Sequence, residues 1–344
     1  MKQPILVIKF GSASVTTANQ EIDEVVIASV AQQVAFLSKN YNIVLVSSGA
    51  IAAGKKKLIN YKGTLSEKKA AAAIGNPLLL QTYSRYFEPY GISIAQSLCE
   101  RHHFSNRNQF LQLKKTYEQL WKSNIIPVAN ENDVVSNLEI KFSDNDELAT
   151  LIAVGFGASM ILYCTSVPGV YDENNNVIRE IGVIDKVALS LARKEKSSVG
   201  LGGMTSKLTF ARLATQMGIK AVIFGLKSEN AIINAVESKT GTVCQPQVIN
   251  ISARKKWLAS GSLVKGKLQV DEGAVKALLK RHSLLAVGVQ KVITGFEAGE
   301  VFEILDSSQV VVAVAKSKID SKMLLKEDNK QNLEIAHADD IVLI

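Results

Sequence analysis

Short apolar runs recur along this 344-residue chain, and longer amphipathic segments separate them. The runs are ILVI at 5–8, IVLV at 43–46, ISIA at 92–95, IIPVA at 125–129, MILYC at 160–164 and AVIFG at 221–225. The intervening segments, such as EVVIASVAQQVAFLSKN, place apolar residues at three- and four-residue steps, as helices do. Strands that alternate with helices predict a mainly parallel sheet with helices on both faces. We therefore expect an α/β domain over residues 1–250.

The pattern changes near residue 250. The segment QPQVINISARKKWLASG has no helical period and contains a proline, a basic cluster and a Gly-Ser turn. Residues 261–344 then show one short helical segment, DEGAVKALLK, among the apolar runs LLAVGV, GEVFEIL, VVVAVA and IVLI. Short runs of this kind between Gly and Asp turns indicate strands. We expect a second, β-rich domain over residues 261–344.

Several classes of protein and site are disfavoured. The three cysteines are far apart and form no CxxC pair, which argues against disulfides or a cysteine zinc site and favours a reducing compartment, the cytoplasm. The uncharged stretch 148–171 is long enough to span a bilayer, but its Gly, Pro, Ser and Thr residues suit a helix that ends at a glycine before a buried strand. His102 and His103 are adjacent and so do not share a helix face, and we predict no metal site there.

The net charge of +8 is distributed unevenly. From Lys255 to the end there are 13 Lys and Arg and 12 Asp and Glu, so the first 254 residues carry +7 of the net charge. A basic N-terminal part suits a protein that handles anionic small molecules. A nearly neutral tail is a poor match to a nucleic-acid backbone, although the cluster Arg254, Lys255 and Lys256 keeps an RNA-binding or regulatory protein as an alternative.

Small, polar or charged residues follow most of the predicted strands. They are Lys9 and Gly11 after the first run, Ser48 and Gly49 after the second, Asn130 and Asp133 after the fourth, and Thr165 and Ser166 after the fifth. In parallel sheets, ligands bind at the carboxyl ends of the strands. The sequence therefore predicts a crevice for a polar ligand at this edge of the sheet.

The motif GLGGMTSK, residues 200–207, places three glycines before a helical segment. The backbone N–H groups and the dipole at a helix N-terminus attract phosphate, and Lys207 would lie in the first turn. The order is not that of a Walker P-loop, and for the motif alone a plain glycine-rich loop is an equally good interpretation. With Lys9, however, it would bring two lysines to one end of the sheet, where they could offset the charge on a transferring phosphoryl group.

Acids and amides gather in NENDVVSNLEIKFSDNDELATLIA, residues 130–153. Either Asp144 or Asn145 is predicted to cap the helix that follows. Asp146 is suited to position a lysine or a metal-bound phosphate, while Asn145 and Asp133 could bind the amino or carboxylate group of a small substrate. No Ser, Cys or His is paired as a covalent nucleophile would be. The predicted chemistry is phosphoryl transfer, with Mg²⁺ carried by the nucleotide.

The motifs IKFGS, VSSGAIAAG, AAAIGNPLLLQ, IIPVANENDVV, EIKFSDNDELA, PGVY and GLGGMTSK, in this order and at this spacing, resemble those of the glutamate 5-kinases in the amino acid kinase superfamily. The part containing QKVITGFEAGEVFEIL is similar to the PUA domain that ends these proteins. The resemblance implies ATP-dependent phosphorylation of the γ-carboxylate of L-glutamate to L-glutamyl 5-phosphate, the first step of proline biosynthesis. A kinase acting on acetylglutamate, carbamate, a nucleoside monophosphate or isopentenyl phosphate is the nearest alternative.

The resemblance also implies a role for individual residues. Those that would bind glutamate are Ser48, Gly49, Asp133 and Asn145. Those that would carry catalysis are Lys9, Lys207 and Asp146, with Asp146 orienting the two lysines. Those that would bind ATP are Lys9, Gly11, Thr165, Ser166, Gly202, Gly203, Met204, Thr205, Ser206 and Lys207.

Two positions depart from the family pattern. Ser166 stands where Asp is common, and Leu201 stands where Thr is usual. A leucine side chain cannot donate a hydrogen bond, so we expect a different nucleotide contact there. The resemblance further implies inhibition by proline with residues 55–69 as a mobile lid, transfer of the labile product to glutamyl phosphate reductase, and a homo-oligomer.

Overall fold

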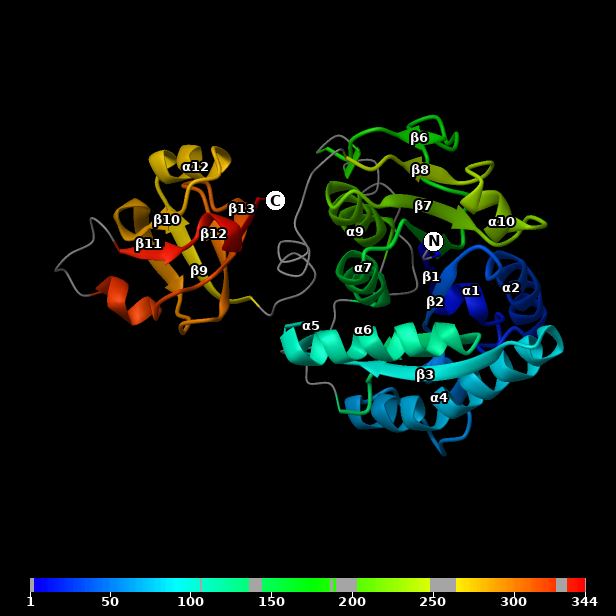
Figure 1. Cartoon of the computed structure of the whole chain (residues 1–344). Helices are drawn as coiled ribbons and strands as arrows, with labels where there is room; N and C mark the ends of the chain where they lie inside the picture. Colours follow the sequence, from blue (N-terminus) through cyan, green and yellow to red (C-terminus); the bar gives the residue numbers. More distant parts are fainter. Residues whose placement is uncertain are drawn as a thin grey trace. The chain divides into compact units, whose positions relative to one another are not determined.

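The computed structural model describes residues 3–105, 107–135, 144–185, 188–189, 203–247, 264–325 and 333–343. The chain divides into two compact units (Figure 1). The larger unit contains Met1–Glu100 and Leu111–Ile249, and the smaller contains Arg101–Phe110 and Asn250–Ile344. The predicted domain boundary, between residues 250 and 261, lies outside the described residues.

An eight-stranded sheet, in the order β3-β4-β2-β1-β5-β7-β8-β6, forms the larger unit. Six strands coincide with the apolar runs of the sequence: β1 (Ile5–Phe10), β2 (Asn42–Ser47), β3 (Ser93–Cys99), β4 (Ile125–Glu131), β5 (Met160–Thr165) and β7 (Lys220–Gly225). Neighbours among these six are parallel, which confirms the predicted α/β class. The other two strands are β6 (Glu180–Ile181) and β8 (Thr242–Cys244), which are too short to show a period in the sequence.

Helices cover both faces of this sheet (Figure 1). On one face α2 (Glu24–Leu37), α4 (Leu65–Phe87) and α10 (Ala231–Val236) share an apolar core with β1, β2, β5 and β7. On the other face α7 (Asn145–Phe156) packs on β1 and α9 (Met204–Gln216) packs on β7. The remaining described helices of four or more residues in the first 250 are α1 (Ser12–Val15), α3 (Ala50–Lys55), α5 (Arg101–Ser105) and α6 (Arg107–Lys122).

The alternation of side chains along β1 decides where Lys9 points. Leu6, Ile8 and Phe10 all belong to the core shared with α2 and α4. Successive residues of a strand point to opposite faces, so Lys9 points to the face covered by α7 and α9. Lys9 of the first strand therefore lies on the same face of the sheet as α7 and α9.

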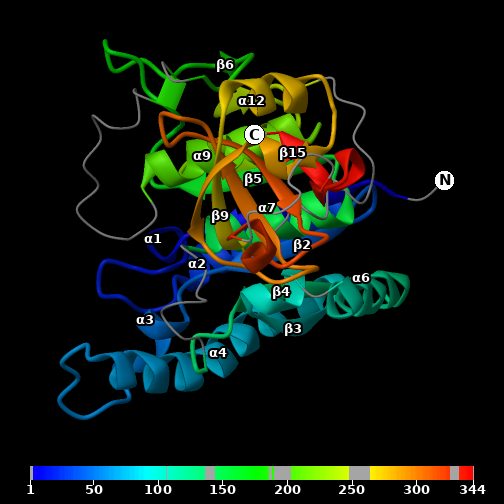
Figure 2. The same cartoon turned by 90° about the vertical axis from the view of Figure 1, so that its left-hand side faces the viewer.

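Helices α3 and α4 touch through their backbones at two glycines. A Cβ atom on Gly54 would lie 1.9 Å from the carbonyl oxygen of Ala71, and one on Gly75 would lie 1.7 Å from that of Ala50. No larger residue fits at either position. In Figures 1 and 2 the edge strand β3 lies between α4 and α6.

Part of the predicted lid at 55–69 is helical, which corrects that expectation. Helix α4 begins at Leu65, and Thr64 and Glu67 form a capping box at its start. The Thr64 backbone N–H donates to Glu67 Oε2 at 2.8 Å, and Glu67 N–H donates to Thr64 Oγ1 at 3.3 Å. This cap limits the segment between α3 and α4 to residues 56–64.

The smaller unit is β-rich, as predicted. Its five-stranded sheet, β11-β9-β12-β13-β15, consists of β9 (Val264–Val270), β11 (Val289–Thr294), β12 (Val301–Leu305), β13 (Val311–Lys316) and β15 (Ile341–Leu343). A second pair is formed by β10 (Leu284–Leu285) and β14 (Glu334–Ala336), and the one described α-helix after residue 264 is α12 (Glu272–Leu279). The rings of Phe296 and Phe302 stack in the core with centroids 4.4 Å apart.

The uncharged stretch 148–171 has the structure expected for it. Helix α7 ends at Phe156, Gly157 follows with φ of +75°, and β5 begins at Met160. Among the described residues, no helix has both the length and the apolar character needed to cross a membrane.

Candidate active site

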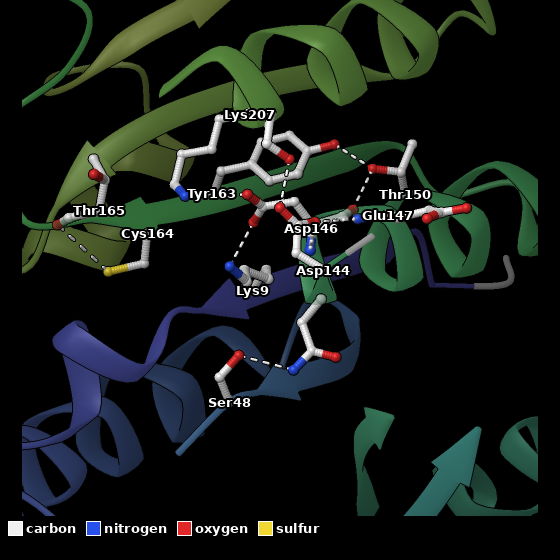
Figure 3. A network of polar contacts seen from close by, with 12 residues as sticks. Lys9, Ser48, Asp144, Asp146, Glu147, Thr150, Tyr163, Cys164, Thr165 and Lys207 are labelled. Atoms are coloured by element: carbon white, nitrogen blue, oxygen red, sulfur yellow. Dashed lines mark hydrogen bonds and ion pairs between the residues drawn. The ribbon is translucent and has the colours of Figure 1, made fainter. Parts of the chain in front are cut away.

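A carboxylate and two ammonium groups meet at the carboxyl end of the central strands (Figure 3). Lys9 Nζ lies 2.6 Å from Asp146 Oδ1, and Lys207 Nζ lies 3.1 Å from Asp146 Oδ2. Asp146 is completely buried, and both lysines are almost completely buried. The three groups together carry a net charge of +1. Ammonium groups at this edge of the sheet can stabilise a bound anion, and Asp146 fixes the position of both.

Each member of this triad comes from the start or end of an element. Lys9 is on β1, Asp146 is in the first turn of α7, and Lys207 is in the first turn of α9. Asp144 caps α7, because its Oδ1 accepts from the N–H groups of Asp146 at 2.9 Å and Glu147 at 3.1 Å. Asp144 is thus the cap among the two predicted candidates.

One carboxylate links the two helix N-termini. Asp144 Oδ1 caps α7, while Oδ2 of the same residue accepts from Ser206 Oγ of α9 at 2.5 Å (Figure 3). Gly203, which precedes α9, has no side chain to cap that helix. Among the described residues no side chain caps α9 at Gly203, and Lys207 lies in the first turn at the positive end of the helix dipole, where a phosphate can bind.

The SSGA turn joins the ends of β1 and β2. Ser48 N–H donates to the carbonyl oxygen of Phe10 at 3.0 Å, and Ser48 Oγ accepts from Asn145 Nδ2 at 2.8 Å (Figure 3). Gly49 has φ of +111°, a conformation that side-chain-bearing residues rarely adopt, and a Cβ there would lie 3.2 Å from Val15 Cγ2. The structure thus joins Ser48 to Asn145 and explains why glycine follows the two serines.

Two hydroxyl groups in series, those of Tyr163 and Thr150, hydrogen-bond to the backbone of Asp146, and we call them the hydroxyl relay. Thr150 Oγ1 donates to the carbonyl oxygen of Asp146 at 2.6 Å, and Tyr163 OH lies 2.6 Å from Thr150 Oγ1 (Figure 3). Thr150 has one hydrogen and gives it to the carbonyl, so Tyr163 is the donor to Thr150. Burial raises the pKa of Tyr163 well above its ordinary value, and the phenol therefore keeps its proton. Tyr163 pairs with Lys9 across β5 and β1.

The remaining predicted residues lie along the same edge of the sheet or outside the described part of the chain. A Cβ on Gly11 would be 3.7 Å from Lys9 Nζ, so this glycine adjoins the triad. Thr165 is the last residue of β5, and Ser166 follows it with an exposed side chain. Met204 is buried and Thr205 is exposed at the start of α9. Gly202 and the departure at Leu201 lie outside the described residues.

Asp133 lies in the turn directly after β4, and its role in substrate binding stays a prediction. Asn130, predicted at the crevice from its place after the fourth apolar run, contacts both Asn76 and Asn145. Three further residues that matter to the site were not predicted: Asn76, Thr150 and Tyr163. Asn76 is the one whose signal was readable, since it is a single amide in the otherwise small and apolar run AAAAIGNPLLL of α4. The others became visible only through their contacts.

The structure also bears on nucleophilic and metal chemistry. Burial raises the pKa of Cys164, next to the site, to about 12, so its thiol is not ionised at neutral pH. Within the part of the chain that the structure describes, no group of three His, Cys, Asp or Glu side chains is arranged to hold a metal ion.

Comparison with known proteins identifies the family of this chain. The amino acid kinase family model matches residues 4–225, and the PUA domain model matches residues 266–338. The chain is 34% identical to a glutamate 5-kinase from Vibrio vulnificus, covering 98% of this chain and 96% of that one. It is also 34% identical to a glutamate 5-kinase from Thermoanaerobacter sp., covering 90% and 86%.

A solved structure shows the same fold. The carbamate kinase from Giardia lamblia bound to AMP-PNP has a TM-score of 0.53 at 15% identity, covering 71% of this chain and 99% of that one. The predicted resemblance is confirmed by the relatives, by the family models and by this fold. The chain belongs to the amino acid kinase family, in its glutamate 5-kinase group, and has a C-terminal PUA domain.

Proposed function

We propose that this chain transfers the γ-phosphoryl group of ATP to the γ-carboxylate of L-glutamate, giving L-glutamyl 5-phosphate and ADP, the first step of proline biosynthesis. The observation that carries the proposal is the buried contact of Lys9 and Lys207 with opposite oxygens of Asp146. The substrate is supported by relatives named glutamate 5-kinase along nearly the whole chain.

In this reaction the two lysines would stabilise the charge on the oxygens of the phosphoryl group during transfer. Asp146 would hold both lysines in place. The γ-carboxylate of glutamate has a pKa of about 4.3 and is ionised at neutral pH, so no general base is required. One carboxylate oxygen forms a bond to the γ-phosphorus while the bond from that phosphorus to the bridging oxygen of ADP breaks, and no proton is transferred.

We assign the binding residues from the resemblance, and their places at this edge of the sheet support the assignment. Glutamate would lie against Ser48, Gly49 and Asn145, with Asp133 at the end of β4. The nucleotide would lie on the other side of the triad, along Gly11, Thr165, Ser166 and the start of α9. Mg²⁺ would come with the nucleotide, because this ion usually binds substrate phosphates and keeps several waters, and it would neutralise phosphate charge.

The test is a substrate panel with the full chain. ADP release is measured with L-glutamate, N-acetyl-L-glutamate, carbamate and UMP, and the glutamate product is trapped with hydroxylamine as γ-glutamyl hydroxamate. We expect ATP- and Mg²⁺-dependent activity with L-glutamate at least tenfold above that with the other acceptors. Preference for another acceptor would assign the chain to a different activity of the family.

Regulation and partners belong to the same proposal. We expect a cytoplasmic homo-oligomer whose product, a labile acyl phosphate, passes to glutamyl phosphate reductase. Proline would inhibit by competing near the glutamate site, and residues 56–64 are the non-helical part of the expected lid. Titrating proline at several glutamate concentrations tests this, and unchanged activity at saturating proline would exclude it.

A further inference from the structure

Three asparagine amides form a chain from helix α4 to the start of α7. Asn130 Nδ2 donates to Asn76 Oδ1 at 3.0 Å, and Asn145 Nδ2 donates to Asn130 Oδ1 at 2.9 Å. The other hydrogen of Asn145 Nδ2 goes to Ser48 Oγ, at 2.8 Å. The chain therefore connects α4 and the end of β4 with two of the residues proposed to bind the substrate.

One backbone group determines which way all three amides face. Glu131 N–H donates to Asn130 Oδ1 at 2.9 Å, and a backbone N–H can only donate. The Nδ2 group of Asn130 must therefore donate to Oδ1 of Asn76. The Oδ1 atom of Asn130 must accept from Nδ2 of Asn145. Turning over any one of these amides would bring two donors or two acceptors together.

With the amides in this orientation, the row of three asparagines has one polar atom without a partner at each of its two ends. Asn76 Nδ2 and Asn145 Oδ1 are buried and have no hydrogen-bond partner among the described residues. Asn76 as a whole is only 6% exposed. A buried donor without a partner is unfavourable, yet reversing the Asn76 amide would only place its Nδ2 against that of Asn130. The fold thus retains an arrangement that is poor for stability and that leaves Asn145 Oδ1 available as an acceptor.

We propose that Asn76 and Asn130 are positioning residues that hold Oδ1 of Asn145 as the acceptor for the α-ammonium group of the amino acid substrate. This inference rests on the proposed phosphorylation of L-glutamate. An amide oxygen accepts hydrogen bonds from an ammonium group and repels a carboxylate, whereas the opposite amide face would do the reverse. The locked orientation therefore discriminates between L-glutamate and glutarate, the same dicarboxylate without the amino group.

The test compares the wild type with two variants that keep the branched shape of the Asn76 side chain. Asn76→Leu removes the acceptor for Asn130 Nδ2, whereas Asn76→Asp keeps an oxygen there. Hydroxamate formation and ADP release are measured with L-glutamate and with glutarate. We expect Asn76→Leu to raise the KM for L-glutamate about tenfold and to lower the glutamate-to-glutarate ratio of kcat/KM about tenfold. The KM for ATP stays within about twofold, and Asn76→Asp stays within about threefold of the wild-type ratio.

The selectivity ratio separates positioning from a merely structural role. A structural defect would lower kcat/KM for both acceptors in proportion, so an unchanged ratio in folded Asn76→Leu overturns the inference. An equal loss of selectivity in Asn76→Asp overturns it too. If the wild type forms no glutamyl hydroxamate, the proposed function fails and the inference fails with it. If Asn76→Leu does not fold, Asn76→Ala removes the same acceptor and is measured in its place.

Discussion

Both units of the chain have ion pairs at their surface, and the larger unit also has a buried one. In the larger unit, Lys9 and Lys207 contact one buried carboxylate. In the smaller unit, ion pairs such as Lys267 with Glu303, and Lys318 with Glu334, lie near the surface and join neighbouring strands or turns. Surface pairs contribute little to stability, and buried ones are rarely needed for it. The buried triad therefore indicates a functional site, whereas the surface pairs carry no such indication.

Substitution of the shared carboxylate should give the largest effect. Asp146→Asn leaves two buried ammonium groups with a neutral amide, so we expect kcat to fall about 10³-fold and the free energy of unfolding to fall by about 3 kcal/mol. Glu303→Gln in the surface pair is the matched control and should leave kcat unchanged. Hydroxamate formation and urea unfolding measure the two quantities. Wild-type activity in Asp146→Asn would remove the triad from the mechanism.

The contact between α3 and α4 should give the next largest effect. Gly75→Ala forces a Cβ into the backbone of α3, where only 1.7 Å separates it from the oxygen of Ala50. We expect the free energy of unfolding to fall by about 2 kcal/mol or more. Gly182→Ala is the control, because nothing lies within 4 Å of its Cβ position, and it should change stability by less than about 0.5 kcal/mol. Equal effects of the two substitutions would contradict the packing account.

The hydroxyl relay should show coupling between its members. Thr150→Val leaves the buried Tyr163 hydroxyl without its acceptor and should lower the free energy of unfolding by about 2 kcal/mol, whereas Tyr163→Phe should lower it by about 1 kcal/mol. The double variant removes both groups and should lose less than the sum. Urea unfolding of the four proteins gives the coupling energy. Strict additivity would mean that the hydroxyls do not act through one another.

The smallest effect is expected at the surface of the smaller unit. Hydrogen bonding to Lys318 lowers the pKa of Glu334 below its ordinary 4.5. The pair therefore stabilises the fold above pH 4.5, and this stabilisation is lost as the pH falls through the lowered pKa. Lys318→Met should reduce stability by less than about 1 kcal/mol at pH 7 and by nothing once Glu334 is protonated. Thermal unfolding at pH 7 and pH 3 measures the difference, and an effect that grows toward low pH would have the wrong sign.

The sequence was informative where structure is local. Each of the six long strands of the larger sheet follows from a run of apolar residues, and the glycine after α7 follows from the need for a left-handed turn. Lys9 and Lys207 could each be placed at the end of a strand or the start of a helix. Their meeting at Asp146 could not be derived from spacing, because it depends on β1 lying next to β5 in the sheet.

Asn76 and Tyr163 show why the contacts of other site residues could not be predicted. An amide in a helix usually faces solvent, whereas Asn76 is buried and its side chain contacts Asn130 of β4. A buried tyrosine is common in a strand such as β5, and a buried threonine is common on the side of a helix that packs on a sheet. Neither residue type alone therefore indicates a site. The hydroxyl contact between them depends on how α7 packs on β5, which no local pattern encodes.

The most direct test of the account compares Lys207→Met with Lys267→Met. The first removes a buried cation of the proposed phosphoryl-transfer site, and the second removes a surface cation of the smaller unit. The measurement is kcat for ATP-dependent γ-glutamyl hydroxamate formation in proteins whose folding is verified by thermal unfolding. We predict that Lys207→Met lowers kcat at least about 100-fold and that Lys267→Met changes it less than about twofold. Wild-type kcat in folded Lys207→Met would contradict the assignment of this site.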